Sequence, residues 1–286
     1  MYLISIGQQA ARVASHFQGM NKSFKLTKIG VDSEEYTVCI PSQLSPEDYE
    51  NKTDFNIFSR LFSSIEDNEE NNIIVAVSGE FVSAITLRLL KEITRENRKI
   101  TIIYLQPNFN FSTEVVKKHS RVLSGVLQEY ARSGMLNDLY LFDYAILDEL
   151  LIDSPIPYYE EKKAQMVAHS FTSIMAMSNN LENIHVDRRS EVSEHQRIKT
   201  IGTIDSDLKE EHLFYPMQEI ENKIYYFGVS EKTMREDKEL LAKVNKFVID
   251  RKKTGQESSF AIYSSPTEYD LYYAVYYTGE VQNVGL

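Results

Sequence analysis

The stretch from Pro157 to Leu181 constrains the fold more than any other part of the chain, because it predicts one long helix near the middle of an alternating series of strands and helices. Its apolar side chains recur at intervals of three and four residues, which places them on one face of a helix of about five to six turns. That face consists of Ala164, Val167, Ala168, Phe171, Ile174 and Met175. Pro157 lies where the first turn of a helix tolerates proline. We interpret this helix as a connection between two domains; the alternative is an ordinary last helix of one domain.

Upstream of this helix, residues 1–156 alternate between apolar runs and amphipathic stretches. The apolar runs predict buried strands at Tyr2–Ile6, Phe24–Val31, Ile73–Val77, Lys99–Leu105 and Leu139–Phe142. The amphipathic stretches predict helices at Gln8–Phe17, Phe58–Ile65, Val82–Ile93 and Thr113–Tyr130. Residues 36–40 are expected to be extended, and the proline-containing residues 41–56 to form a surface excursion. Buried strands separated by helices favour a parallel, doubly wound sheet.

Downstream, residues 182–286 show a different pattern, beginning with a polar segment through Arg197. Strands are predicted at Ile198–Ile204, Lys223–Val229, Ser258–Ser264 and Tyr269–Thr278. One amphipathic helix is predicted at Lys232–Arg251, with Leu240, Leu241, Val244, Phe247 and Val248 on its inner face. The predicted fold class is therefore α/β. A Rossmann-like parallel sheet domain (1–156) is followed by a central connecting helix (157–181) and a smaller α+β domain (182–286) whose sheet has about four strands.

Charge and composition exclude several classes of protein. The chain carries 31 basic and 42 acidic residues, a net charge of −11, so we expect neither nucleic acid nor an anionic membrane surface as a partner. The single cysteine, Cys39, cannot form an internal disulfide, and its apolar neighbours predict that it is buried. No run approaches the ~20 apolar residues of a membrane span, and the first residues predict a strand, so we expect a cytoplasmic location. The six histidines are not grouped at zinc-binding spacing, so no metal site is expected.

Several segments combine a predicted strand with a distinctive loop and a helix. They are ISIGQQAARVASHF (Ile4–Phe17), VSGEFVSAITLRLLKEI (Val77–Ile93), ITIIYLQPNFNFSTEVVKKH (Ile100–His119), LYLFDYAILDELL (Leu139–Leu151) and, near the end, IYYFGVSEKT, SSFAIYSS and YDLYYAVYYTG. In this order they resemble the tubulin/FtsZ superfamily, and the resemblance covers nearly the whole chain from Tyr2 to Gly279. It implies a nucleotide-type domain, a long connecting helix and a second α+β domain.

The resemblance also implies where a nucleotide would bind. The corresponding positions are Gly7, Gln8, Gln9, Ser78, Gly79, Pro107, Ser112 and Tyr144. In the family the signature loop is mostly glycine, because several backbone N–H groups must surround the phosphates without Cβ atoms in the way. Here residues 77–83 keep one glycine, and Glu80 and Phe81 add negative charge and bulk where phosphate would lie. Like charges about 4 Å apart repel by roughly 1 kcal/mol in water and more where solvent is scarce. We therefore expect phosphate binding to be lost or strongly altered.

Hydrolysis in the family depends on the loop after the central helix, whose acidic residues reach the nucleotide of the next subunit and polarise the attacking water. Asp187 and Glu191 are the acidic residues at the corresponding place, and they are the candidate catalytic residues. Arg188 and Arg189 lie between them, a run that is also typical of a solvated, self-paired loop.

These patterns lead to one functional hypothesis and two alternatives. The leading hypothesis is a divergent tubulin/FtsZ-like assembly protein, a filament or structural subunit that associates head to tail, with a degenerate nucleotide site and no cofactor. The first alternative is a polymerising GTPase that binds GTP with Mg. The second is a monomeric binding module that kept only the fold. Other protein partners, the host process and a cellular, viral or plasmid origin stay open.

Overall fold

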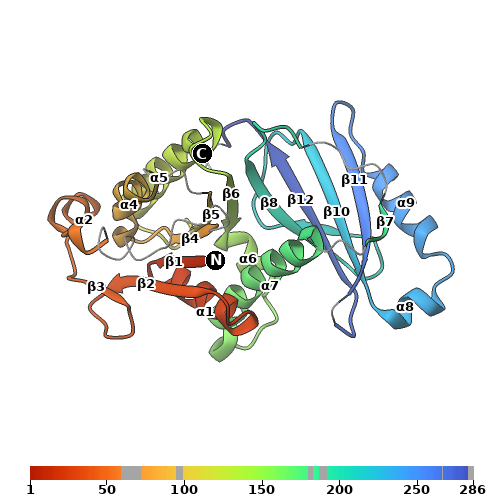
Figure 1. Ribbon diagram of the computed structural model, residues 1–286, viewed down its shortest axis with the longest axis horizontal. Coiled ribbons are helices and arrows are strands. Elements are labelled where there is room, and N and C mark those ends of the chain that lie inside the picture. The colour runs from red at the N-terminus through yellow and green to blue at the C-terminus, as the bar shows by residue number, and fades with distance from the viewer. Residues whose placement is uncertain (59–71, 95–98, 180–182, 187–191, 266, 283–286) are drawn as a thin grey trace.

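Within the part of the chain that the structure describes, twelve strands form one mixed sheet (Figure 1). The computed structural model describes residues 1–58, 72–94, 99–179, 183–186, 192–265 and 267–282. The first part of the sheet contains, in spatial order, β3 (Val38–Ile40), β2 (Lys25–Val31), β1 (Tyr2–Ile6), β4 (Ile73–Ser78), β5 (Ile100–Gln106) and β6 (Asp138–Asp143). All neighbouring strands in this part are parallel, as the alternation of strands and helices predicts.

The second part of the sheet is mostly antiparallel. It continues through β8 (Ile198–Ile204), β12 (Leu271–Thr278), β10 (Asn222–Val229), β11 (Glu257–Ser264) and β7 (Asn183–Val186), with β9 (Glu211–Leu213) beside β8. The two parts are joined by parallel pairing between β6 and β8, where Leu139 and Tyr140 face Ile198 and Lys199. The sequence predicted a separate sheet for each domain, and this was wrong. The pairing of β6 with β8 could not be predicted, because the pattern of a strand does not indicate which distant strand it pairs with.

Helices cover both faces of the first part of the sheet (Figure 1). Helices α1 (Gln8–Met20) and α7 (Tyr159–Asn179) pack on one face. Helices α4 (Thr86–Thr94) and α5 (Glu114–Arg132) pack on the other, with the 3-10 turn η1 (Phe81–Ile85) leading into α4. Burial on both faces explains why β4 reads IIVAVS, with all six residues buried.

Helix α7 confirms the long helix expected from the sequence. Its buried apolar residues are Ala164, Val167, Ala168, Phe171, Ile174 and Met177; Met175 is only partly buried. The ring of Phe171 makes edge contacts with Phe17 of α1, at 5.5 Å, and with Tyr140 of β6, at 4.9 Å. One apolar cluster runs from α1 through α7 to the tyrosines of β10 and β12. Because this cluster and the sheet cross both proposed boundaries, the division at residues 156 and 181 stays a prediction.

Several local expectations were wrong. Residues 41–56 contain a helix, α2 (Pro46–Lys52), which Ser45 caps by accepting a hydrogen bond from the Asp48 amide. The helix predicted at Lys232–Arg251 is two helices, α8 (Glu231–Glu236) and α9 (Leu240–Asp250), and Leu241 is exposed rather than inward-facing. Cys39 is exposed because it alternates with the buried Val38 and Ile40 and so points to the other face of the edge strand β3. Of the helix expected at 58–65, only its first residue is among the described ones.

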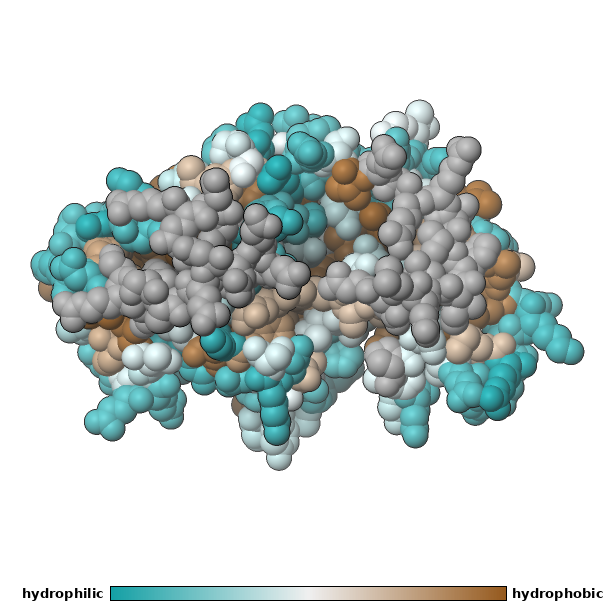
Figure 2. Space-filling model, in the orientation of Figure 1, coloured by the Kyte–Doolittle hydropathy of each residue, from teal (hydrophilic) through white to brown (hydrophobic). Residues whose placement is uncertain are grey.

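Several short elements were not predicted, because a segment of a few residues is too short to show a periodic pattern. They are α6 (Tyr144–Leu150), the 3-10 turn η2 (Ile156–Tyr158), β7 and β9. No helix among the described residues is long and apolar enough to cross a membrane. Hydrophilic residues form much of the rim of the face shown in Figure 2, as the charged composition predicts.

Candidate functional site

The loops that follow the parallel strands meet at one edge of the sheet, where ligands bind in folds of this class. Gly7 follows β1 and Ser78 ends β4; a Cβ atom on Gly7 would lie 2.2 Å from the Ser78 hydroxyl. Gly79 meets Pro107, which follows β5; a Cβ atom there would lie 2.4 Å from the proline Cδ. The structure therefore brings these four predicted positions together. Because a side chain on either glycine would force the loops apart, both glycines serve close packing of protein against protein.

The remaining predicted positions are spread more widely. Gln8 and Gln9 form the first turn of α1, and Tyr144 begins α6 after β6. Ser112 lies in the loop between β5 and α5, where its hydroxyl donates to the Asn108 carbonyl, 2.8 Å away. Asp187 and Glu191 lie outside the described residues.

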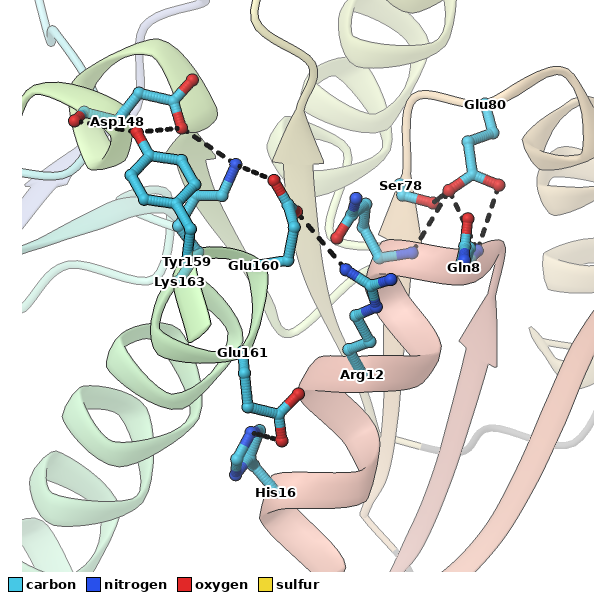
Figure 3. Close-up of polar contacts among 11 residues, drawn as sticks. Gln8, Arg12, His16, Ser78, Glu80, Asp148, Tyr159, Glu160, Glu161 and Lys163 are labelled. Carbon is cyan, nitrogen blue, oxygen red and sulfur yellow. Dashed lines mark hydrogen bonds and ion pairs between the residues drawn. The ribbon is translucent and has the colours of Figure 1, made fainter. Parts of the chain in front are cut away.

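Glu80 places its carboxylate on the N-terminus of α1 (Figure 3). The Gln8 amide donates to both carboxylate oxygens, at 2.9 and 3.0 Å, and the Gln9 amide donates to one of them at 3.2 Å. The Ser78 hydroxyl donates to the same carboxylate at 3.1 Å. The first amides of a helix have no partner within the helix and carry partial positive charge, so an anion is stabilised there. Glu80 thus supplies, from another loop, the anion that this helix end favours.

The backbone of Glu80 is anchored as well as its side chain. The Ser83 hydroxyl donates to the Glu80 carbonyl, at 2.6 Å, and lies 2.9 Å from Nε2 of His119 on α5. Burial lowers the pKa of His119 below its ordinary value, so the neutral ring is favoured. A neutral ring that donates from Nε2 completes a chain from His119 through Ser83 to Glu80.

A network of charges lies beside Glu80 and joins α7 to α1 and α6 (Figure 3). Lys163 of α7, whose side chain is 6% exposed, contacts Asp148 of α6 at 2.9 Å and Glu160 at 2.7 Å. Arg12 of α1 lies 3.6 Å from the other oxygen of Glu160. Sequence reasoning missed this network. The three-residue spacing of Glu160 and Lys163 was a usable signal, but nothing in the sequence places Arg12 or Asp148 beside them.

Tyr144 and Asp143 are buried at the end of β6. Tyr144 is 6% exposed, and the Lys163 ammonium lies 4.9 Å from its ring centre. Asp143 caps α6 through the Ala145 amide, at 2.8 Å, and accepts a hydrogen bond from the Gln106 side chain at 2.8 Å. Burial raises the pKa of Asp143 to about 6. The Tyr144 ring is already covered by protein, so little of it is free to stack on a base.

No group of three or more metal-binding side chains (His, Cys, Asp or Glu) occurs within the part of the chain that the structure describes.

The chain resembles known proteins in structure but not in sequence. No protein-family model matches the chain, and no curated protein matches it in sequence. An FtsZ dimer from M. jannaschii matches with a TM-score of 0.66 and 12% identity, over 97% of this chain and 88% of that chain. A GTPγS-form protofilament of TubZ from Bacillus thuringiensis serovar israelensis matches with a TM-score of 0.70 and 12% identity, over 97% and 86%. A helical model of a four-stranded TubZ-Bt filament matches with a TM-score of 0.71 and 11% identity, over 96% and 85%.

The chain has the tubulin/FtsZ fold. This confirms the fold that the ordered segments of the sequence predicted, including the central helix α7. The sequence resemblance predicts that the loop after β4 corresponds to the glycine-rich signature loop of the tubulin/FtsZ superfamily, and this correspondence stays a prediction. Glu80 lies in that loop, and its carboxylate engages the first amides of α1.

Proposed function

We propose that this tubulin/FtsZ-like protein is an assembly subunit that associates head to tail and whose nucleotide site is degenerate. The solved structures that share its fold include GTPγS-form and GDP-form protofilaments and two- and four-stranded filaments of TubZ. A heterologous contact that does not close into a ring generates a filament, and this fold supports such contacts in those proteins. Its single cysteine suits a cytoplasmic location.

The observation that carries the degenerate site is the position of the Glu80 carboxylate. A phosphate that approached α1 would have to displace it from the Gln8 and Gln9 amides, and hydrogen bonds to a charged acceptor contribute about 1.5–3 kcal/mol each. If Glu80 stayed, two like charges about 4 Å apart near a protein surface would repel by roughly 4 kcal/mol. The loops at Gly7 and Gly79 also pack closely against Ser78 and Pro107, which supports a site occupied by protein groups. A nucleoside triphosphate with Mg does not fit this arrangement, so we derive no hydrolytic step.

The test measures assembly and nucleotide binding separately. Sedimentation velocity over a wide concentration range, with electron microscopy of the heaviest fractions, should show species that grow with concentration, equally with and without GTP and Mg. Calorimetric titration with GTP and with ATP should show no binding in the micromolar range. A 33.1 kDa species that persists at every concentration would exclude assembly and favour the monomeric binding module. Micromolar affinity for either nucleotide would exclude the degenerate site.

An active GTPase is the second candidate, and the GTPγS-form TubZ protofilament is the observation that favours it. In that case phosphate release should rise steeply with protein concentration, because neighbouring subunits complete the site. Asp187→Asn and Glu191→Gln should then each lower turnover while assembly persists. Phosphate release that stays at the level of a protein-free control would exclude this candidate.

A further inference from the structure

A cavity of about 320 Å³ lies between α2, the segment formed by η1 and α4, and α5. These elements lie together at the end of the molecule that is far from α8 and α9 (Figure 1). Cavities that hold small molecules begin at about this size, and most of them have an apolar lining with a few polar groups. The lining of this cavity follows that pattern.

Five apolar side chains form most of the lining. They are Ala84 of η1, Leu87 of α4, and Val115, Val122 and Leu123 of α5. Leu123 is buried, whereas Val115 and Val122 are 53% and 64% exposed, so apolar side chains reach from the core to the surface. A hydrocarbon group in the cavity would remove these exposed side chains from water, which favours binding.

The α2 wall of the cavity is fixed to α4. Nη1 of Arg88 donates to the Glu50 carbonyl at 2.7 Å, and the guanidinium carbon of Arg88 lies 3.8 Å from the centre of the Phe55 ring. Pro46, the first residue of α2, is buried and also lines the cavity. The cavity is therefore formed before a ligand arrives, which lowers the entropy cost of binding.

His119 of α5 supplies a hydrogen-bond acceptor. The Ser83 hydroxyl donates its one proton to the Glu80 carbonyl, so it accepts from Nε2 of His119, 2.9 Å away. Burial lowers the pKa of His119, against a smaller opposite effect of Glu47, and the neutral ring is favoured. A neutral ring with its proton on Nε2 has a lone pair on Nδ1. Because His119 lines the cavity and Nε2 is taken by Ser83, Nδ1 is the ring nitrogen left for a ligand.

The charged side chains around the cavity favour a positive ligand. Glu47 and Glu50 of α2 line it on one side, and Lys118 of α5 lines it on the other. Glu47 lies close enough to His119 to act electrostatically on its ring. Lys118 is the one cation among the described residues that line the cavity, and it is exposed on a long side chain that can turn to solvent. Two carboxylates and Nδ1 of His119 therefore face a ligand as acceptors.

We propose that this cavity binds a small apolar amine. The hydrocarbon part lies among the five apolar side chains, and the ammonium group donates to Nδ1 of His119 and to the Glu47 carboxylate. Charge-assisted hydrogen bonds to these acceptors select an ammonium group over a carboxylate. This site does not depend on the proposed function, because none of its lining residues contacts the first amides of α1.

The test follows the histidine rings of the full chain by NMR, with n-hexylamine as the probe. The chain has six histidines, so ¹⁵N labelling of histidine alone gives a simple spectrum, and His119→Gln identifies the His119 signal by its loss. In the free protein His119 should carry its proton on Nε2. Addition of n-hexylamine should shift the His119 signal in a saturable way, with a dissociation constant of about 1–10 mM for so small a ligand.

Selectivity and charge variants test the ammonium contact. Hexanoate, which has the same chain length and the opposite charge, should bind at least about tenfold more weakly. Glu47→Gln should weaken the binding of n-hexylamine about three- to tenfold, and Lys118→Gln should strengthen it about twofold, because each changes the charge beside the ammonium group. Glu129→Gln removes a charge from an exposed position of α5 outside the cavity and should change nothing.

A variant that fills the cavity tests the position of the ligand. Ala84→Leu places a larger side chain in the space and should abolish the shift of His119; if this variant does not fold, Leu87→Phe makes the same test. Binding that survives the filling would mean that the amine binds elsewhere. The absence of a saturable shift up to about 50 mM n-hexylamine would overturn the proposal, because that concentration is well above the expected dissociation constant. Equal affinity for hexanoate, or a free-protein proton on Nδ1 of His119, would overturn the recognition of an amine.

Discussion

Glu80 shows how a side chain from another loop can occupy the N-terminus of a helix. In a phosphate-binding site the first amides of the helix are free to donate to the ligand. Here the Gln8 and Gln9 amides of α1 donate to the Glu80 carboxylate of the same chain. We predict that Glu80→Gln lowers the free energy of unfolding by about 1 kcal/mol, because a charged partner at the helix N-terminus becomes neutral. Hydrogen exchange at the Gln8 and Gln9 amides should become faster. Urea unfolding and exchange measured by mass spectrometry check both effects.

The matched control for Glu80 is Glu34→Gln, which removes the same charge from an exposed position. It should change neither the free energy of unfolding nor exchange at the start of α1. Equal effects of the two substitutions would show that Glu80 acts through net charge and not through the α1 amides.

Asp143 should make the stability of the protein depend on pH. Burial raises its pKa in the folded protein to about 6 from an ordinary value of 3.8, so between these values the folded state binds the proton more tightly than the unfolded state. The contribution of Asp143 to the free energy of unfolding should therefore fall as pH rises from about 4 to 6, by about 2–3 kcal/mol. Asp143→Asn should remove this fall and make the protein more stable than the wild type at pH 7.5, with little difference at pH 4.

The Asp143→Asn variant can keep the contacts of the wild-type side chain. The oxygen of the new carboxamide can still accept from the Ala145 amide, and Oε1 of Gln106, which has no partner in the structure, can accept from the new amide group once Gln106 turns over. Thermal unfolding of both proteins across this pH range is the measurement. A constant difference between them at all pH values would contradict the raised pKa.

At the scale of elements, α7 connects the parts of the molecule through a few large side chains. Phe171 is 3% exposed and lies between Phe17 and Tyr140. We predict that Phe171→Ala lowers the free energy of unfolding by about 3–5 kcal/mol, because it removes buried area and leaves a cavity. Gln165→Ala, at an exposed position of the same helix, should cost less than about 0.5 kcal/mol. Chemical denaturation of both variants is the measurement. Similar decreases in the free energy of unfolding for the two substitutions would mean that α7 is not a packed core helix.

The elements also show which patterns could be read in advance. The apolar stripe of α7 and the apolar run of β4 identify their structures, because burial repeats at a fixed spacing within each segment. The stretch at 232–251 misled because its charges continue across the break between α8 and α9. There Ser230 caps the first helix, and Asp237 binds Lys243 outside the regular helical spacing. Such a break depends on side-chain contacts that helical periodicity does not encode.

At the scale of the whole molecule, charge and assembly oppose each other. Each copy carries a net charge of −11, so copies repel at low ionic strength, over a Debye length of about 30 Å at 0.01 M salt and about 8 Å at 0.15 M. If the protein assembles as proposed, raising salt from about 0.01 to 0.15 M should lower the concentration at which polymers appear. Pelleting across this range, with and without GTP, is the measurement. A rise in that concentration would show instead that complementary charges hold the contact between copies.

The order of the main strands and helices, the central helix and the scarcity of glycine in the loop after β4 were all readable from the sequence, because each depends on the spacing or identity of adjacent residues. Several features came only with the tertiary structure: the joining of the two parts of the sheet at β6 and β8, the seat of Glu80 on α1, the network around Lys163 and the pairing of Gln128 with Gln282. Each of these joins residues that are distant in the chain. Local patterns record how much of a side chain is buried, but which distant partner it meets is decided when the elements pack together.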